Sequence, residues 1–137
     1  MDTDIQTLRC SFRRLAPRAD SLAQCFYDML FSRHPEVLPL FEGVRFDEQR
    51  KKLVRALALV VRHLEQPDFL RAYLQGLGAI HLAYGVAPEH YHAVGECLLA
   101  ALAETAGSSW SAAEAAAWQG AFELISEAML SGAVKAG

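Results

Sequence analysis

Four polar side chains interrupt the apolar faces of predicted helices, and the first of them is a histidine. Between residues 68 and 82 the apolar positions recur at helical spacing up to Leu74 and Leu77, and the next position on that face is His81. This spacing points the imidazole into the core. There it either hydrogen-bonds to a backbone carbonyl, as buried histidines commonly do, or offers a ring nitrogen as a ligand.

The second and third of these side chains are an amide and a phenol. Gln49 lies one turn before Leu53, whose apolar face continues along a helix predicted over residues 46–64. Tyr27 lies in a helix predicted over residues 18–33, which is apolar on almost every side. Both polar groups are therefore expected to point inward.

The fourth side chain is Tyr91, which shares a predicted core-facing stripe with Val94 and Leu98 in a helix over residues 89–105. Each of the four has an ordinary explanation as a buried polar group with a backbone partner. They also have one shared use. Haem iron needs a strong axial donor, commonly imidazole, facing a pocket that contains a few hydrogen-bond donors.

Long helices must position these side chains, because few helix-breaking signals interrupt the chain. Prolines and one Gly-Ser-Ser turn separate segments rich in Ala, Leu, Arg and Glu, with little of the alternation that marks a strand. We predict an all-α single domain spanning residues 1–137. The predicted helices cover residues 4–15, 18–33, 46–64, 68–82, 89–105 and 111–131, with Ser111 and Glu114 as a start signal for the last.

Composition and charge exclude several classes of protein. The chain is 53% hydrophobic with a formal net charge of -3, and its basic residues are scattered, so nucleic acid is not expected as a partner. No stretch approaches the length of a membrane span, and the first residues carry acids rather than an apolar leader, so we expect a cytoplasmic protein. Three cysteines without a CxxC pair indicate reduced, buried thiols.

Two long blocks carry a resemblance to a known family. Residues 26–41 read FYDMLFSRHPEVLPLF, and residues 77–99 read LGAIHLAYGVAPEHYHAVGECLL. In these blocks the chain resembles bacterial single-domain globins and the haem domain of flavohaemoglobins, and more loosely neuroglobin-like proteins. The resemblance spans nearly the whole chain. It implies a globin fold, a three-over-three helical sandwich around one haem b (iron protoporphyrin IX).

The resemblance also implies roles for single residues. His81 matches the proximal ligand of haem iron, and Phe41 matches the phenylalanine wedged against haem after the proline-containing turn. Tyr27 matches the distal tyrosine. Gln49 matches the distal-helix glutamine, and Leu53 matches the apolar residue that packs over the iron one turn later. Tyr27 and Gln49 are thus the candidate catalytic pair.

Further positions complete the predicted cofactor pocket. Tyr91 matches a tyrosine whose hydroxyl joins a proximal hydrogen-bond network in flavohaemoglobins, and Val94 and Leu98 follow it on the same helix face. In flavohaemoglobins a glutamate completes that network. Its position falls close to Ala133 here and no carboxylate occupies it, so a strongly imidazolate-like ligand is not expected. Lys52 is a candidate partner for a haem propionate, with plain exposure as its simpler explanation.

The implied function is tight, reversible binding of dioxygen, and of other diatomic ligands such as CO and NO. Bound dioxygen has partial superoxide character, which donors such as Tyr27 and Gln49 stabilise. One alternative is a nitric oxide dioxygenase that converts NO and O2 to nitrate with a separate reductase, since no flavin domain precedes the end of the sequence at Gly137. A second alternative is a haem-free helical interaction domain. The chain is expected to be a monomer or a homodimer.

The remaining histidines receive structural roles in this interpretation. His63 lies near a helix end, where it complements the helix dipole, and His34 is expected on the surface. His90 and His92 flank Tyr91, but side chains two residues apart on a helix do not converge on one ion.

Overall fold

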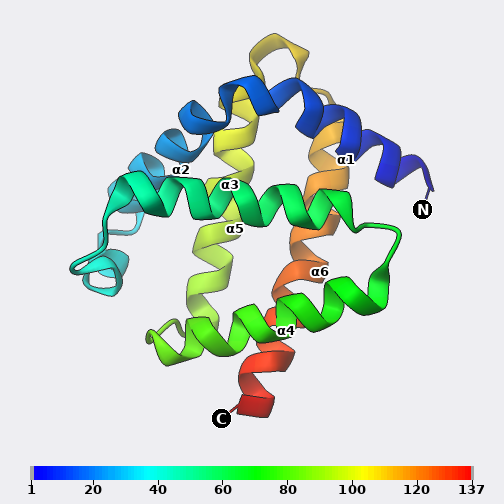
Figure 1. Ribbon diagram of the computed structural model, residues 1–137. Coiled ribbons are helices and arrows are strands. Elements are labelled where there is room, and N and C mark those ends of the chain that lie inside the picture. The colour runs from blue at the N-terminus through cyan, green and yellow to red at the C-terminus, as the bar shows by residue number, and fades with distance from the viewer. Residues whose placement is uncertain (1, 137) are drawn as a thin grey trace.

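Six α-helices and three short 3-10 helices form the part of the chain that the structure describes (Figure 1). The computed structural model describes the backbone of residues 2–136 and the side chains of residues 4–134. No strand occurs in this part, which confirms the predicted all-α class. The α-helices are α1 (Asp2–Leu15), α2 (Ala19–Arg33), α3 (Phe46–Arg62), α4 (Pro67–Ala83), α5 (Pro88–Ala106) and α6 (Ala112–Ala136). The 3-10 helices are η1 (Ala16–Arg18), η2 (Pro35–Phe41) and η3 (Gly107–Ser109).

Local signals account for where several helices begin. Proline occupies the first turn of η2, α4 and α5, where its missing N–H leaves no hydrogen bond broken. Ser111 and Glu114 form the predicted capping box of α6. The Glu114 N–H donates to Ser111 Oγ at 3.1 Å, and the Ser111 N–H donates back to Glu114 Oε1 at 3.2 Å.

The largest boundary difference is at the end of α6, which continues to Ala136 instead of ending near residue 131. The extra turn includes two alanines, which favour helix, and no proline stops it. Helix α3 is shorter than predicted and ends at Arg62, because His63 leaves the helical conformation with ψ near 21°. Two residues inside the predicted helix therefore belong to the turn before Pro67.

The helices pack in crossing layers. Figure 1 shows α3 and α4 lying across α5 and α6, with α1 and α2 at the opposite end of the molecule from the C-terminus. The most extensive contacts join α4 to α6 and α2 to α5, and α2 also packs against α3. Two helix pairs close in space are thus distant in sequence, and the space between α3 and α4 faces the α5–α6 layer.

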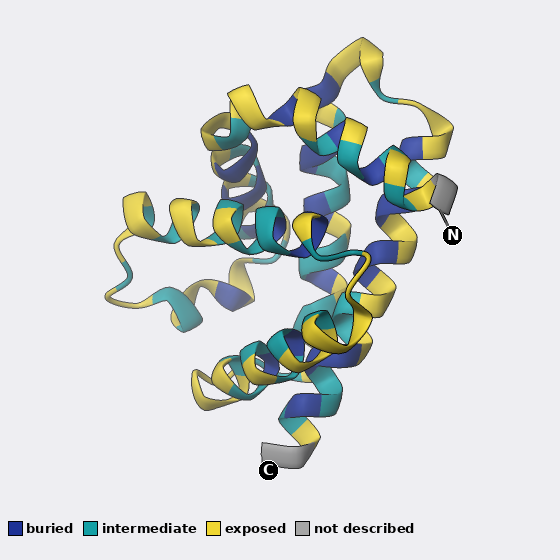
Figure 2. Ribbon diagram, turned by 45° about the vertical axis from the view of Figure 1, so that its right-hand side comes forward, coloured by how far each residue is buried: buried dark blue, intermediate teal, exposed yellow. Residues whose placement is uncertain are grey.

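The core has a large and a small cluster of apolar side chains. The large cluster gathers residues from α1, α2, α3, α5 and α6, including the fully buried Trp118, Leu22 and Leu102. The small cluster joins Val60 and Leu74 to α6. Figure 2 shows the buried positions along one side of the helices and exposed positions along the other. Among the described residues, no helix combines the length and apolar character that crossing a membrane requires.

Helix α4 approaches α6 so closely that only glycine fits at two positions. A Cβ on Gly78 would lie 1.8 Å from the backbone oxygen of Met129, and a Cβ on Gly132 would lie 2.0 Å from the backbone oxygen of Gln75. Two backbones therefore touch at this crossing. Because His81 follows Gly78 by one turn of α4, this contact fixes the position of the histidine relative to the core.

Candidate functional site

The site begins with His81, which lies two residues before the end of α4 and is half-buried. Its Nδ1 lies 2.7 Å from the backbone oxygen of Leu77, one turn earlier. A carbonyl oxygen can only accept, so Nδ1 carries the proton and the neutral ring has an unprotonated Nε2. Metal-binding histidines are held in this way, with the second ring nitrogen donating to a carbonyl. Both predictions for His81, a carbonyl partner and a ligand nitrogen, are compatible in this geometry.

The backbone of His81 also ends the helix. Its carbonyl oxygen accepts hydrogen bonds from the N–H groups of Tyr84 and Val86, at 3.1 and 3.0 Å. Gly85 takes a positive φ of 91° between them, a conformation that favours glycine and turns the chain toward α5. Backbone and side chain of His81 are therefore both held, which gives the imidazole a defined orientation.

Tyr27 and Gln49 meet in the structure. The Nε2 of Gln49 donates to the Oη of Tyr27 at 3.0 Å, linking α2 to α3. Burial raises the pKa of the Tyr27 phenol, and the hydrogen bond from Gln49 partly opposes that rise. The phenol thus keeps its proton at neutral pH. Because the amide supplies a hydrogen to Oη, the O–H proton of Tyr27 is free to donate elsewhere.

Three phenylalanine rings pack around this pair. Phe41, Phe31 and Phe46 each lie within 6.0 Å of the Tyr27 ring, measured between centroids, and contact one another in edge-to-face and stacked pairs. Phe41 comes from the end of η2 and Phe46 from the start of α3. Such rings exclude water from the hydroxyl. Phe41 is a predicted site residue, whereas Phe31 and Phe46 were not predicted, although the density of phenylalanines between residues 26 and 46 is visible in the sequence.

The other predicted residues lie on α3 and α5. Leu53 and Val94 are half-buried against the large core cluster, and Leu98 is buried within it. Lys52 is exposed. Tyr91 instead packs on the small cluster, where burial raises the pKa of its phenol. Among the described residues no hydrogen-bond partner for its hydroxyl is present.

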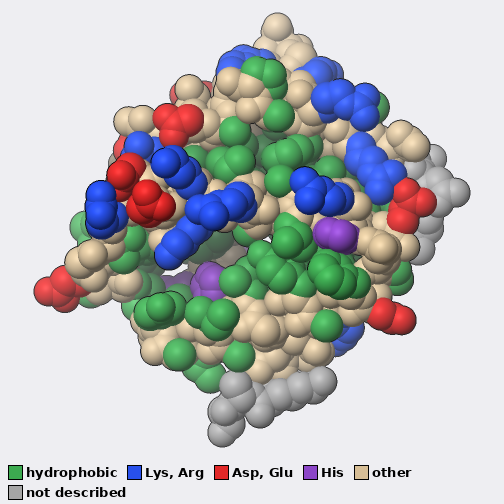
Figure 3. All heavy atoms as spheres, in the orientation of Figure 1, with side chains coloured by type: hydrophobic (Ala, Val, Ile, Leu, Met, Phe, Trp, Pro, Cys, Tyr) green, Lys and Arg blue, Asp and Glu red, His purple; other side chains and the backbone are tan. Residues whose placement is uncertain are grey.

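The surface between α3 and α4 is hollowed. Figure 3 shows this hollow bordered by Lys and Arg side chains on one side and by histidine and apolar side chains on the other. Along α3 the exposed basic residues include Lys51, Lys52 and Arg55. At the end of α4, Ile80 is 53% exposed and Leu82 is 40% exposed. The hollow therefore combines an imidazole, apolar surface and a basic border.

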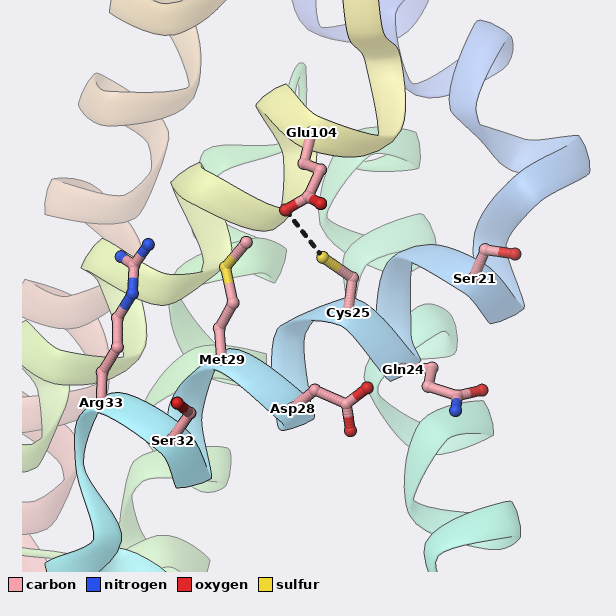
Figure 4. Close-up of a pocket in the computed structure, with 8 residues that line it drawn as sticks. All are labelled: Ser21, Gln24, Cys25, Asp28, Met29, Ser32, Arg33 and Glu104. Atoms are coloured by element: carbon pink, nitrogen blue, oxygen red, sulfur yellow. Dashed lines mark hydrogen bonds between the residues drawn. The ribbon is translucent and has the colours of Figure 1, made fainter.

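A second concavity lies on the opposite side of α2 and is not part of this site. It is an open groove of about 590 Å³ between α2 and α5 (Figure 4). Cys25 lies in it, with Sγ 3.6 Å from the Oε2 of Glu104. Burial raises the pKa of this thiol, as do the neighbouring carboxylates, Glu104 foremost. Cys10 is exposed and Cys25 half-exposed, so the prediction of three buried thiols is wrong except for Cys97, because α1 and α2 turn the first two outward.

Comparison with known proteins identifies the family. The globin family model matches residues 24–129. The chain belongs to the globin family. Among solved structures, a globin from Campylobacter jejuni is 28% identical, with a TM-score of 0.86 over 98% of this chain and 97% of that one. The predicted globin fold is confirmed.

Other relatives carry more specific names. An engineered carbene transferase is 26% identical, with a TM-score of 0.88 over 98% of this globin and 94% of that chain. It derives from a Rhodothermus marinus protein whose assumed activity is that of a nitric oxide dioxygenase. A flavohemoprotein of Rhizobium meliloti is 34% identical over 79% of this globin, and one of Halalkalibacterium halodurans is 28% identical over 91%. This globin spans 27% and 31% of the length of those two flavohemoproteins.

The residues of the hollow fit the haem that this family and these relatives imply. His81 offers an unprotonated Nε2, which is the donor that haem iron commonly takes in globins. The apolar side chains that Figure 3 shows beside the hollow suit the faces of a porphyrin, and the Lys and Arg side chains at its border suit its carboxylates. We therefore describe the chain as a haem-binding globin.

Proposed function

We propose that this globin holds haem b through the Nε2 of His81 and retains dioxygen through hydrogen bonds from Tyr27 and Gln49. Haem supplies a ferrous iron that takes diatomic ligands such as O2, CO and NO. The observation that carries the proposal is the hydrogen bond from Gln49 to the Oη of Tyr27. It leaves a buried phenol proton available as a donor toward a ligand in the same pocket.

The protein's own residues divide the work. His81 is oriented by the carbonyl of Leu77, and Leu53 adds apolar volume on the distal helix. Phe41 packs beside the distal phenol and limits the access of water. Lys52, which is exposed on α3, pairs in this proposal with a carboxylate of the cofactor. Tyr91, Val94 and Leu98 line the α5 side of the predicted pocket.

The strength of the distal pair sets the expected rate of ligand release. A hydrogen bond to a charged or strongly polar acceptor contributes about 1.5–3 kcal/mol, and 1.4 kcal/mol corresponds to about a tenfold change in a rate or equilibrium constant. Removing the phenol hydroxyl should therefore accelerate release of dioxygen by about ten- to a hundredfold. Such slow release in the native protein favours retention or reaction of dioxygen over its delivery.

The test is to measure dioxygen dissociation by displacement with carbon monoxide in the wild type, Tyr27→Phe and Gln49→Leu. Both variants should release dioxygen faster, while Tyr73→Phe, on the half-buried face of α4, serves as a matched control with an unchanged rate. Absorption spectra of His81→Ala test the proximal ligand, because loss of that imidazole should abolish or alter the Soret band. Unchanged dissociation in Tyr27→Phe would contradict the proposed distal role.

A second candidate function is the conversion of nitric oxide to nitrate. The likeness to flavohemoproteins and to the Rhodothermus marinus protein favours it. One NO, one O2 and one electron give one nitrate, so the reaction requires a reductase that regenerates the ferrous state. We propose that a separate, flavin-dependent reductase supplies that electron.

Sustained turnover separates the two functions. The haem-loaded protein is mixed with NO in aerated buffer containing a reduced nicotinamide cofactor and a flavin reductase, and both NO and nitrate are measured. Continued consumption of NO with equal formation of nitrate would establish the dioxygenase. A single stoichiometric burst without turnover would leave dioxygen binding as the function. A protein that takes up no haem would instead favour the haem-free interaction domain.

A further inference from the structure

Three potential metal ligands meet between the end of α2 and the middle of α5. His34 follows the last residue of α2, and Glu96 and Cys97 are consecutive in α5. One ligand atom from each residue lies within 4.8 Å of the other two. The His34 Nε2 and the Glu96 Oε1 are 3.7 Å apart. This cluster lies outside the proposed haem site and does not depend on the proposed function.

The ring of His34 lacks a hydrogen-bond partner where it faces the cluster. The Nε2 atom is buried from solvent and accepts or donates no hydrogen bond among the described residues. The expectation that His34 lies on the surface is therefore wrong: its side chain is only 23% exposed, because η2 begins directly after it and folds it toward α5. Buried polar atoms of this kind are rare and call for a partner.

The other nitrogen of the ring has a carboxylate beside it. The His34 Nδ1 lies 3.4 Å from the Oε2 of Glu36, one residue into η2 beyond Pro35. When Nδ1 donates its proton to Glu36, the neutral ring has its lone pair on Nε2, facing Glu96 and Cys97. Histidine ligands of metal ions commonly have such a carboxylate on their second nitrogen.

We propose that His34, Glu96 and Cys97 bind a divalent transition-metal ion, and that zinc is the ion this donor set fits. Zinc accepts nitrogen, oxygen and sulfur together, with water as a fourth ligand. In a tetrahedral zinc site the ligand atoms lie roughly 3.3–3.7 Å apart. The separation of 3.7 Å between Nε2 and Oε1 exceeds the about 3.4 Å expected for a nitrogen and an oxygen ligand by a few tenths of an ångström. The flexible, 46% exposed Glu96 side chain provides the remaining adjustment.

Binding changes the protonation of the cluster in a defined way. The Cys97 thiol is fully buried, and burial foremost raises its pKa, so without a metal ion it carries its proton. The zinc–sulfur bond replaces the sulfur–hydrogen bond, and one proton leaves to solvent while zinc stays divalent. Arg33 lies 3.7 Å from Glu96 through its Nη1. Its half-exposed side chain can move into solvent when zinc takes its place.

The location gives the ion a structural consequence. His34 immediately precedes η2, which carries Phe41 at its other end. An ion shared with α5 would fasten the α2–η2 corner to the helix that carries Cys97. We therefore expect zinc to raise the melting temperature of the haem-loaded protein.

The test uses haem-loaded protein, reduced at its thiols, and titrates it with zinc by calorimetry and native mass spectrometry. One zinc per chain is expected. His34→Asn and Cys97→Ser should each weaken binding by a factor of about ten or more, and Glu36→Gln, acting through the ring of His34, by about tenfold. The matched controls are His92→Asn, which removes an exposed histidine of α5, and Cys10→Ser, which removes an exposed thiol. Both controls should bind as the wild type does.

X-ray absorption at the zinc edge provides a readout independent of the variants. A sulfur neighbour at about 2.3 Å is expected in the wild type. Neighbours that are only nitrogen or oxygen would place the ion elsewhere and overturn the proposal. Equal zinc affinity in the wild type and His34→Asn would also overturn it, as would no bound zinc at all, which would leave His34 paired with its two glutamates. Because His34 lies at a helix end, its variant keeps the test usable if Cys97→Ser fails to fold.

Discussion

Two glycines of α4, two residues apart, should respond in opposite directions to the same substitution. A Cβ on Gly76 would meet no atom within 4 Å, whereas a Cβ on Gly78 would lie 1.8 Å from the backbone oxygen of Met129. Alanine in place of glycine inside a helix stabilises by about 0.5–1 kcal/mol where space is open. We expect Gly76→Ala to raise the free energy of unfolding by about that amount.

Gly78→Ala gains the same helical preference but has to push two backbones apart. The 1.8 Å separation is far below the 3.4 Å at which ordinary contact begins. Relief requires α4 to move away from α6, since the obstructing atoms belong to backbone and no flexible side chain can yield. Overpacking of this kind costs about 1–3 kcal/mol or more. Because the helical preference is common to both variants, they should differ in stability by the overpacking cost alone, about 1–3 kcal/mol or more.

Urea unfolding of the haem-free protein, followed by circular dichroism, measures this difference. In a domain of this size, each kcal/mol of stability corresponds to a shift of about 4 °C in melting temperature. Gly132→Ala should act in the same direction as Gly78→Ala, because its Cβ would lie 2.0 Å from the backbone oxygen of Gln75. The Soret band of the haem-loaded Gly78→Ala protein should also change, since His81 moves with α4. Equal stability of the Gly76→Ala and Gly78→Ala variants would refute the close approach of the two helices.

Three further predictions concern buried polar groups and thiols. Glu114 is buried; although burial itself acts to raise its pKa, hydrogen bonds from Ser11 and Arg14, the charge of Arg14 and the Ser111 N–H lower it below the usual value. The stabilisation that ionised Glu114 gives the folded protein is therefore present above the ordinary carboxyl pKa and is lost as pH falls through the lowered pKa. Glu114→Gln should lower the free energy of unfolding by about 1–3 kcal/mol at neutral pH, as urea unfolding would measure, and should make stability depend less on acid pH. Because burial raises the pKa of Tyr27, dioxygen release measured in stopped flow should stay constant with rising pH up to the ordinary tyrosine pKa of about 10. A thiol-reactive disulfide reagent should modify exposed Cys10 in the native protein and the fully buried Cys97 only after unfolding, as mass spectrometry of the products would reveal.

Several features of the fold are legible in the sequence because they depend on neighbours along the chain. The capping pair Ser111 and Glu114 bonds as its three-residue spacing predicts. The imidazole of His81 finds its carbonyl partner one helical turn away, at Leu77. The end of α6 is less well predicted, because Gly132 follows the predicted end and lies inside the helix, where it packs against the backbone of α4.

The contact between Tyr27 and Gln49 cannot be predicted from neighbours along the chain alone. Periodicity predicts that Tyr27 and Gln49 both point inward, and the family resemblance predicts that they share a pocket. Their 3.0 Å hydrogen bond joins residues 22 positions apart on different helices. That contact depends on how α2 and α3 cross, which no local spacing encodes. The ring of Phe46 joins the pair for the same reason and was not predicted.

The sequence by itself determined the six helices, their inward faces and the candidate histidine, because helical periodicity and capping act over three or four residues. Tertiary structure alone decided which of these faces meet. It placed Gly78 against the backbone of Met129 and brought His34 close to Cys97, which lies 63 positions later in the chain. The physical reason is that such contacts are set by the packing of whole helices, whose crossing depends on side-chain volume and shape at many positions at once.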